Sequence, residues 1–148
     1  MRTETLLRGA ILAGAAFFVV VGAWALGAPA SFYHHVASFP PYNRHFLHDV
    51  GAFQLGLGAA LLLALTAWSG RLVALWAVTV ASVLHAVSHV LDRDLGGRGS
   101  DPVLLSLAAA AFLLVAVLGT RKEVRRDSPA PPPVGLRPPA SPREPQPD

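Results

Sequence analysis

Residues 72–91 read LVALWAVTVASVLHAVSHVL, twenty consecutive positions that contain no Asp, Glu, Lys or Arg. As an α-helix, a segment of about 17–25 apolar residues crosses the hydrocarbon core of a membrane, which is about 30 Å thick. The same stretch carries His85 and His89, whose titratable side chains are costly to place in hydrocarbon. The segment is therefore predicted to be a membrane-spanning helix, with polar side chains near one end that need a structural or chemical reason.

Uncharged stretches of similar length occur on both sides of this segment. The intervals 9–43, 50–70 and 102–120 also lack Asp, Glu, Lys and Arg. Together they predict four transmembrane helices, at about residues 9–28, 46–69, 72–91 and 102–120. The expected fold is all-α: a polytopic membrane protein forming an antiparallel four-transmembrane-helix bundle over residues 1–126. A cleaved signal peptide is an alternative for the first stretch, but three more spans follow it and it exceeds the usual apolar region of about 7–15 residues.

The composition agrees with a membrane protein and excludes several kinds of site. Hydrophobic residues make up 53% of the chain and charged residues only 14%, against about a quarter in soluble domains. Cysteine is absent, which excludes disulfides, thiolate catalysis, zinc–thiolate sites and iron–sulfur clusters. The basic residues that raise the pI to about 10.2 lie at membrane edges and in the tail, so nucleic acid is not an expected partner.

The first loop, residues 29–43, is predicted to contain a short helix lying in the membrane interface. Pro29 suits a helix start. Phe32, Val36 and Phe39 fall at i, i+4 and i+7, which places them on one helical face. The two prolines at positions 40 and 41 are then expected to end the helix.

Three local signals mark other boundaries. Asp101 followed by Pro102 predicts a helix start, with the aspartate as N-cap and the proline as first helical residue. Trp68 is expected to anchor the inner membrane boundary. Residues 127–148 are rich in proline and poor in large apolar side chains, so they predict a disordered cytoplasmic tail.

The distribution of basic residues predicts the orientation. Four spans place both termini on one side, and the cytoplasmic edges of membrane proteins are enriched in Lys and Arg. Seven basic residues flank the spans on the side of the termini, against three on the other side. The termini are therefore predicted to be cytoplasmic, in a multi-pass protein of the cell membrane. The seven are Arg2, Arg8, Arg71, Arg121, Lys122, Arg125 and Arg126, and the three are Arg44, Arg93 and Arg98.

This topology gathers the six histidines at the opposite, outer end of the bundle. His85 and His89 are four residues apart, about 40° around a helix, and Asp92 lies within about 20° of His85. Ser82 lies one turn earlier on the same stripe. Two imidazoles at this spacing are a common metal-binding arrangement, for which Asp92 is a candidate third ligand or hydrogen-bond partner. The alternative is that these side chains bond to neighbouring helices or to interfacial water.

A second polar cluster begins the second span. His45, His48 and Asp49 fall on its first turn, where the helix dipole also favours Asp49. Arg44 could pair with Asp49 or bind an anionic headgroup or substrate. Haem would need one ligand from this cluster, because the two histidines of the third span share one helix and cannot lie on opposite sides of one iron.

Further polar and small residues complete the set of candidates. His34 and His35 lie in the first loop and are secondary ligand candidates. Gln54 is the only other strongly polar side chain within the second span and is expected to make one interhelical hydrogen bond. Gly51 and Gly58 are seven residues apart, which predicts that a neighbouring helix backbone approaches closely.

Three features together resemble the DoxX-like small bacterial membrane proteins. They are the aromatic and proline-rich first loop, the second-span start Tyr42-Asn-Arg-His-Phe-Leu-His-Asp-Val-Gly-Ala-Phe-Gln-Leu-Gly-Leu-Gly58, and the third-span ending His85-Ala-Val-Ser-His-Val-Leu-Asp92. The resemblance covers residues 6–120 and rests on layout more than on catalytic residues. It implies an accessory membrane role. Some members are linked to quinone-coupled sulfur oxidation or oxidative-stress complexes, whereas this chain has no cysteine to handle sulfur.

Two classes of function follow. The first is an accessory or ligand-binding membrane protein that uses the outer polar cluster. The second is a membrane oxidoreductase subunit, or a metal- or haem-binding protein, in which the histidines of the second and third spans take direct part. A transition metal is the first cofactor to consider, followed by haem and quinone. The expected partners are the lipid bilayer and either another membrane protein or a second copy of the chain.

Overall fold

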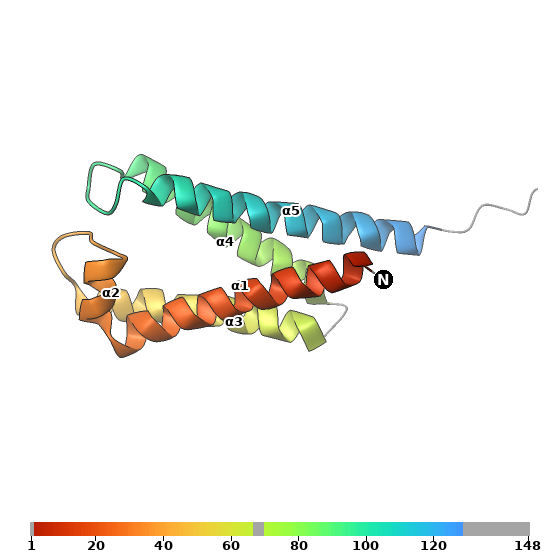
Figure 1. Ribbon diagram of the computed structural model, residues 1–148, viewed down its shortest axis with the longest axis horizontal. Coiled ribbons are helices and arrows are strands. Elements are labelled where there is room, and N and C mark those ends of the chain that lie inside the picture. The colour runs from red at the N-terminus through yellow and green to blue at the C-terminus, as the bar shows by residue number, and fades with distance from the viewer. Residues whose placement is uncertain (1, 67–69, 129–148) are drawn as a thin grey trace, which may run out of the picture.

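The structure is a computed structural model that describes residues 2–66 and 70–128, with side chains from residue 4 onward. Within these ranges the chain forms five α-helices and no strand (Figure 1). They are α1 (Arg2–Gly27), α2 (Pro29–His35), α3 (Arg44–Thr66), α4 (Arg71–Leu91) and α5 (Asp101–Asp127). The predictions for Trp68 and for the proline-rich residues 129–148 lie outside the described residues.

Four of these helices, α1, α3, α4 and α5, are long and apolar enough to cross a membrane. The all-helical class and the four candidate spans are therefore confirmed. The clearest difference in length is in α5, which continues beyond the predicted span and through the basic residues 121–126 to Asp127. This segment is rich in Arg, Lys and Glu, which have high helix propensity, so the helix persists where the apolar sequence ends.

The exterior of the molecule is strongly apolar. Many large hydrophobic side chains of the four long helices are exposed, and three of the most exposed are Phe53, Leu91 and Val73, at 76%, 74% and 73%. A monomeric soluble protein rarely exposes continuous apolar surface on this scale. This surface fits the acyl chains of a lipid bilayer, where helices satisfy their own backbone hydrogen bonds.

Glycine residues allow α1 and α3 to pack with their backbones almost in contact. A Cβ atom on Gly22 would lie 2.8 Å from the carbonyl oxygen of Gly51 and 2.8 Å from the backbone nitrogen of Leu55. A Cβ atom on Gly58 would lie 3.1 Å from the backbone nitrogen of Val19. The close approach predicted from Gly51 and Gly58 is therefore confirmed, and α1 is the helix that approaches.

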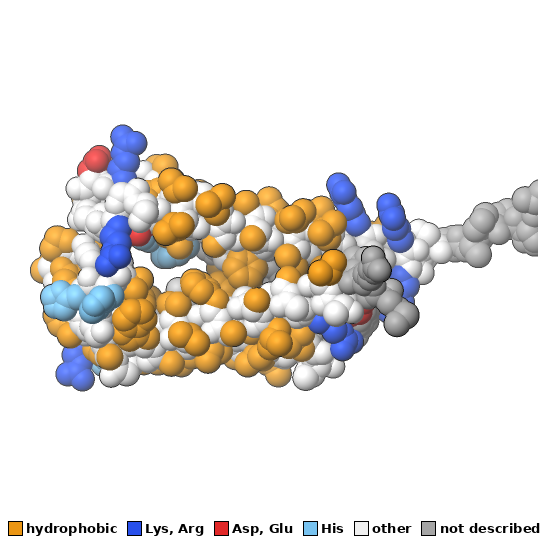
Figure 2. All heavy atoms as spheres, viewed as in Figure 1, with side chains coloured by type: hydrophobic (Ala, Val, Ile, Leu, Met, Phe, Trp, Pro, Cys, Tyr) orange, Lys and Arg blue, Asp and Glu red, His pale blue; other side chains and the backbone are white. Residues whose placement is uncertain are grey.

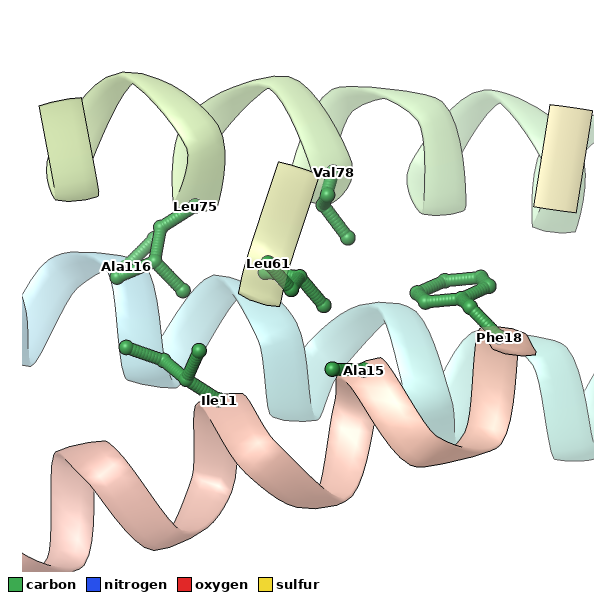
Figure 3. Packing of buried hydrophobic residues seen from close by; sticks show 7 residues of the cluster. All are labelled: Ile11, Ala15, Phe18, Leu61, Leu75, Val78 and Ala116. Carbon is green, nitrogen blue, oxygen red and sulfur yellow. The ribbon is translucent and has the colours of Figure 1, made fainter. Parts of the chain in front are cut away.

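The second helix pair, α4 and α5, packs around Gly119. A Cβ atom on Gly119 would lie 3.0 Å from the side chain of Leu72. One turn after Leu72 on α4, the indole of Trp76 donates a 3.0 Å hydrogen bond to the hydroxyl of Thr120. A buried cluster joins this pair to α1 and α3, with side chains from all four long helices (Figure 3). Its members are Ile11, Ala15, Phe18, Leu61, Leu75, Val78 and Ala116.

The two helix pairs do not pack against each other along their whole length. Helix α1 contacts mainly α3, and α4 contacts mainly α5, whereas α1 and α5 touch very little. Figure 2 shows the molecule hollowed between α1 and α5 at the end where α2 and the 92–100 loop lie. We call this end the α2 end and the opposite end the N-terminal end. The core cluster therefore joins the pairs away from the hollow.

Two local predictions were wrong. The first-loop helix ends at His35, so Val36 and Phe39 do not share its face as predicted. The chain leaves the helix at Val36, and the hydroxyl of Ser38 donates to the carbonyl oxygen of Tyr33 at 3.1 Å. The second wrong prediction concerns the N-cap of α5.

Asp101 is the first residue of α5 rather than its N-cap. The residue before it, Ser100, already has helical backbone angles, and its carbonyl oxygen accepts a hydrogen bond from the backbone N–H of Leu104. The carboxylate of Asp101 instead accepts a 2.8 Å hydrogen bond from the backbone N–H of Arg98. The Asp101 side chain therefore stabilises the preceding loop and does not cap the helix.

Candidate functional site at the α2 end

The two histidines of α4 lie side by side near its C-terminus. The ring centroids of His85 and His89 are 4.7 Å apart and nearly perpendicular. The ring of His89 also contacts Phe39 of the first loop, with centroids 5.3 Å apart. The hydroxyl of Ser88 donates a 2.8 Å hydrogen bond to the backbone carbonyl of His85. The two imidazoles therefore lie in contact with each other on adjacent turns of α4.

Two glycines hold the first loop against the 92–100 loop. The backbone N–H of Gly97 donates a 3.0 Å hydrogen bond to the carbonyl oxygen of Ser38. Gly96 and Gly97 have φ angles of 134° and 80°, which favour glycine. A Cβ atom on Gly97 would lie 2.7 Å from the ring of Phe39. These glycines therefore position Phe39, and through it the first loop, over His89.

The other members of the α4 stripe lie on either side of this pair. Ser82 is partly buried one turn before His85. Asp92 is exposed just beyond the end of α4, and its backbone N–H donates to the carbonyl oxygen of Ser88. Its carboxylate therefore lies at the surface, where it is solvated rather than held against the imidazoles by a described contact.

The polar cluster at the start of α3 divides into an exposed and a buried part. His45 pairs with Asp49 at 3.6 Å, but the two side chains are 87% and 53% exposed, so this contact contributes little stability. Arg44 is exposed and forms no ion pair with any described residue. By contrast, the Nε2 atom of His48 is buried and has no hydrogen-bond partner among the described residues.

Gln54 presents a second unsatisfied polar atom. It lies in the middle of α3 and is partly buried, and its Oε1 atom is buried without a hydrogen-bond partner in the described part of the chain. The interhelical hydrogen bond predicted for Gln54 is therefore not made through this oxygen. A buried amide oxygen that accepts no hydrogen bond is costly, unless water or a ligand supplies the donor.

The histidines of α2 belong to an aromatic group. His35 Nδ1 lies 2.9 Å from the carbonyl oxygen of Ser31, and its ring centroid lies 6.1 Å from that of Trp24. His34 packs against Tyr33 with centroids 5.5 Å apart. Both histidines are exposed, and their contacts are within or next to α2. They therefore form the surface of the α2 end and are not brought to the α4 histidines by any described contact.

The described residues do not assemble a complete metal centre. Within residues 2–66 and 70–128, no three His, Asp or Glu side chains are grouped so that they could hold one ion. The α4 imidazoles could supply at most two ligands from one helix. Chemically, the imidazoles of His85 and His89 and the amide of Gln54 can donate and accept hydrogen bonds.

Comparisons with protein-family models, with curated proteins and with solved structures find no match to this chain. Only the geometry of the described residues therefore indicates what the candidate site can do.

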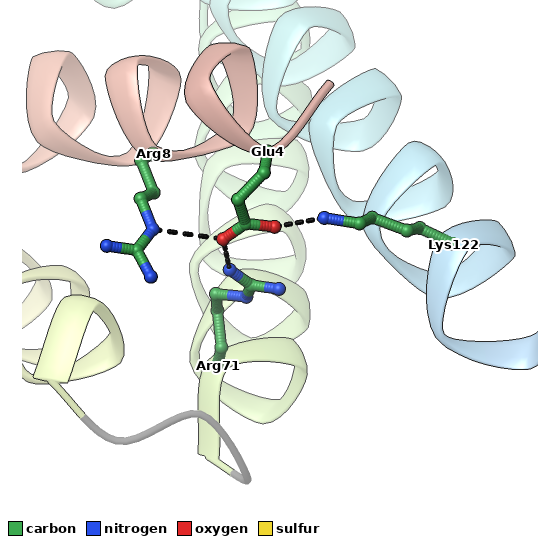
Figure 4. Close-up of polar contacts among 4 residues, drawn as sticks. All are labelled: Glu4, Arg8, Arg71 and Lys122. Carbon is green, nitrogen blue, oxygen red and sulfur yellow. Dashed lines mark hydrogen bonds and ion pairs between the residues drawn. The ribbon is translucent and has the colours of Figure 1, made fainter. Parts of the chain in front are cut away.

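Sequence reasoning missed an ionic cluster at the N-terminal end (Figure 4). The Oε1 atom of Glu4 accepts hydrogen bonds from Arg71 of α4 at 2.7 Å and from Arg8 of α1 at 3.0 Å. Its other oxygen, Oε2, pairs with Lys122 of α5. Arg71 is only 4% exposed. One signal could have revealed the cluster: Glu4 is the only acidic residue before Asp49, and it is flanked by basic residues.

Proposed function

We propose that this chain is a DoxX-like accessory protein of the cell membrane that binds a small ligand in the hollow at its α2 end. In this proposal the four spans form an antiparallel bundle, α2 lies in the membrane interface, and both termini are cytoplasmic. The apolar exterior and the seven basic residues near the N-terminal end support the membrane placement and the orientation. The ligand-binding role rests on one observation.

That observation is the amide oxygen of Gln54 on α3, which is buried and has no hydrogen-bond partner among the described residues. Leu61 of α3 and Val78 of α4 belong to the same buried core. Gln54 precedes Leu61 by seven residues, and His85 follows Val78 by seven residues, which returns each to nearly the same helix face. Both polar side chains are therefore about 10 Å from the core toward the α2 end, where the helix pairs separate.

The chemistry of these groups indicates the kind of ligand. The Gln54 oxygen needs a hydrogen-bond donor, and a neutral imidazole can donate through one nitrogen and accept through the other. The surrounding helix surfaces are apolar. The hollow is therefore suited to an uncharged, largely apolar molecule that carries at least one hydroxyl or amine.

Removing the polar groups of the hollow is expected to release such a molecule. The test is native mass spectrometry of the full chain extracted in mild detergent from its own membranes. A non-covalent adduct heavier than the chain is expected, and it should be lost in Gln54→Leu and in His85→Phe. His45→Gln is the matched control, because His45 is a largely exposed histidine of the α3 start. An adduct that survives both hollow variants, or the absence of any adduct, would argue against the proposal.

A second candidate is direct metal or haem binding by the histidines, as in a membrane oxidoreductase subunit. The 4.7 Å separation of the His85 and His89 rings favours it, since two imidazoles on adjacent turns can share one ion. The same purified sample distinguishes the two candidates. A stoichiometric metal that disappears in His85→Ala/His89→Ala supports the second, and a Soret band identifies haem.

The orientation can be measured because the chain contains no cysteine. Single cysteines at Ser100 and Ser128 would report on opposite ends of the bundle, and both positions are exposed. In intact cells, a membrane-impermeant maleimide is expected to label Ser100→Cys and to leave Ser128→Cys unlabelled until the cells are broken. The reverse pattern would place the termini outside and would overturn the orientation.

A further inference from the structure

An apolar groove follows the line where α1 and α5 pass each other. It encloses about 250 Å³ and opens to the side of the molecule. Small side chains line it together with the rings of Phe17 and Phe112. A Cβ atom on Gly14 would lie 2.8 Å from the ring of Phe112, so the glycine makes room for that ring. The small residues are Ala10, Gly14, Ala108 and Ala111.

Cationic side chains continue the line of this groove on α5. Val115 lines the groove, and Lys122 and Arg126 follow it by seven and eleven residues. At about 100° per residue both fall within about 20° of Val115 around the helix. Lys122 also reaches across to Glu4 of α1, which precedes the groove residue Ala10 by six residues on the same helix.

The charge at this end of the groove is positive overall. Arg8, Arg71 and Lys122 pair with the carboxylate of Glu4. The last turns of α5 add three cations and two carboxylates, so cations outnumber carboxylates by six to three. The added cations are Arg121, Arg125 and Arg126, and the added carboxylates are Glu123 and Asp127. The uncharged part of α5 ends at residue 120, so these cations lie at the depth of lipid headgroups. The groove therefore joins a surface suited to hydrocarbon with one suited to an anion.

We propose that this groove binds an anionic phospholipid, with one acyl chain along the α1/α5 groove and its phosphate beside Lys122 and Arg126. The occupant follows from charge complementarity: a neutral apolar molecule would not use the cations, and a free anion would not use the groove. A transmembrane helix of a partner would fill the apolar groove but would not require the positive charge. The proposal uses other side chains than the function proposed for the α2 end and does not depend on that function.

The test compares phosphatidylglycerol with phosphatidylcholine carrying the same acyl chains. Each is titrated into the full chain in detergent, and retained lipid is counted by native mass spectrometry. Phosphatidylglycerol should bind more tightly, and Arg126→Gln should weaken its binding about fivefold, since one cation near a charged headgroup contributes about 1 kcal/mol. Arg121→Gln is the matched control. Arg121 is also exposed in the same basic segment, but it lies about 140° from Arg126 around α5.

The groove is tested separately with Ala111→Leu, which should fill it and reduce lipid retention, whereas Ala110→Leu adds the same side chain about 100° away. Equal retention of both lipids, or complete displacement of the lipid by inorganic phosphate, would overturn the proposal. So would an equal loss of lipid binding in Arg126→Gln and Arg121→Gln, or an equal loss in Ala111→Leu and Ala110→Leu. A dimer that Ala111→Leu dissociates would instead identify the groove as a helix–helix interface and would equally overturn it.

Discussion

Replacing Gly51 with valine is expected to force α1 away from α3 and to leave little folded, monodisperse protein. A Cβ atom on Gly51 would lie 2.7 Å from Leu26 Cγ, 2.9 Å from the carbonyl oxygen of Gly22 and 3.0 Å from the backbone nitrogen of Leu26. Two of these neighbours are backbone atoms of a packed helix and cannot rotate away. Overpacking a core usually costs about 1–3 kcal/mol, and a clash between two backbones belongs at or above the upper end.

The stability of Gly51→Val is best measured by unfolding in mixed detergent micelles, followed by circular dichroism, with size-exclusion chromatography for aggregation. Gly51→Ala should show an intermediate loss because its only added atom is the Cβ that makes these contacts. Gly56→Val is the matched control on the same helix, since a Cβ on Gly56 has no neighbour within 4 Å. If Gly51→Val and Gly56→Val unfold alike, helix propensity explains both and the close α1–α3 contact is not needed.

The sequence predicted the position and apolar character of each helix better than the contacts between helices. The uncharged intervals were enough to predict four apolar helices, and the spacing of Gly51 and Gly58 predicted a close helix contact. The partner residue Gly22 could not be chosen in this way. Its position opposite Gly51 depends on how far α1 slides along α3, and that register is set by packing between segments distant in the sequence.

In the candidate site, too, the sequence predicted relations within one helix but not contacts between distant segments. Helical spacing predicted that His85 and His89 share a face, because that relation lies within one helix. The contact between His89 and Phe39 was not predicted, since it requires Gly96 and Gly97 to hold two loops together. Likewise, no spacing rule places Glu4 beside Lys122, which is 118 residues away along the chain. Such contacts come from tertiary structure alone.

Neutralising Glu4 is expected to be the most destabilising single change at the N-terminal end. In the native protein, a carboxylate oxygen of Glu4 lies 2.7 Å from the guanidinium of Arg71, a residue that is only 4% exposed. Glu4→Gln removes this carboxylate from the buried guanidinium. Breaking a buried ion pair by removing one partner typically costs about 3–5 kcal/mol. Because the Glu4 side chain is 24% exposed, water screens part of the interaction, and we expect a loss near the lower limit. The free energy of unfolding in mixed micelles measures it.

The position of Glu4 gives this loss a structural consequence. Its carboxylate contacts α4 through Arg71 and α5 through Lys122, so it links the two helix pairs at the end opposite the hollow. Arg8→Gln is the matched control: Arg8 contacts the same carboxylate, but its side chain is 58% exposed, so its removal should cost less than about 1 kcal/mol. Glu4→Gln/Arg71→Met should recover much of the stability, because no buried charge is then left without its carboxylate. If the double variant is as unstable as Glu4→Gln, or if Arg8→Gln costs as much, the buried Arg71 pair is not what stabilises this end of the bundle.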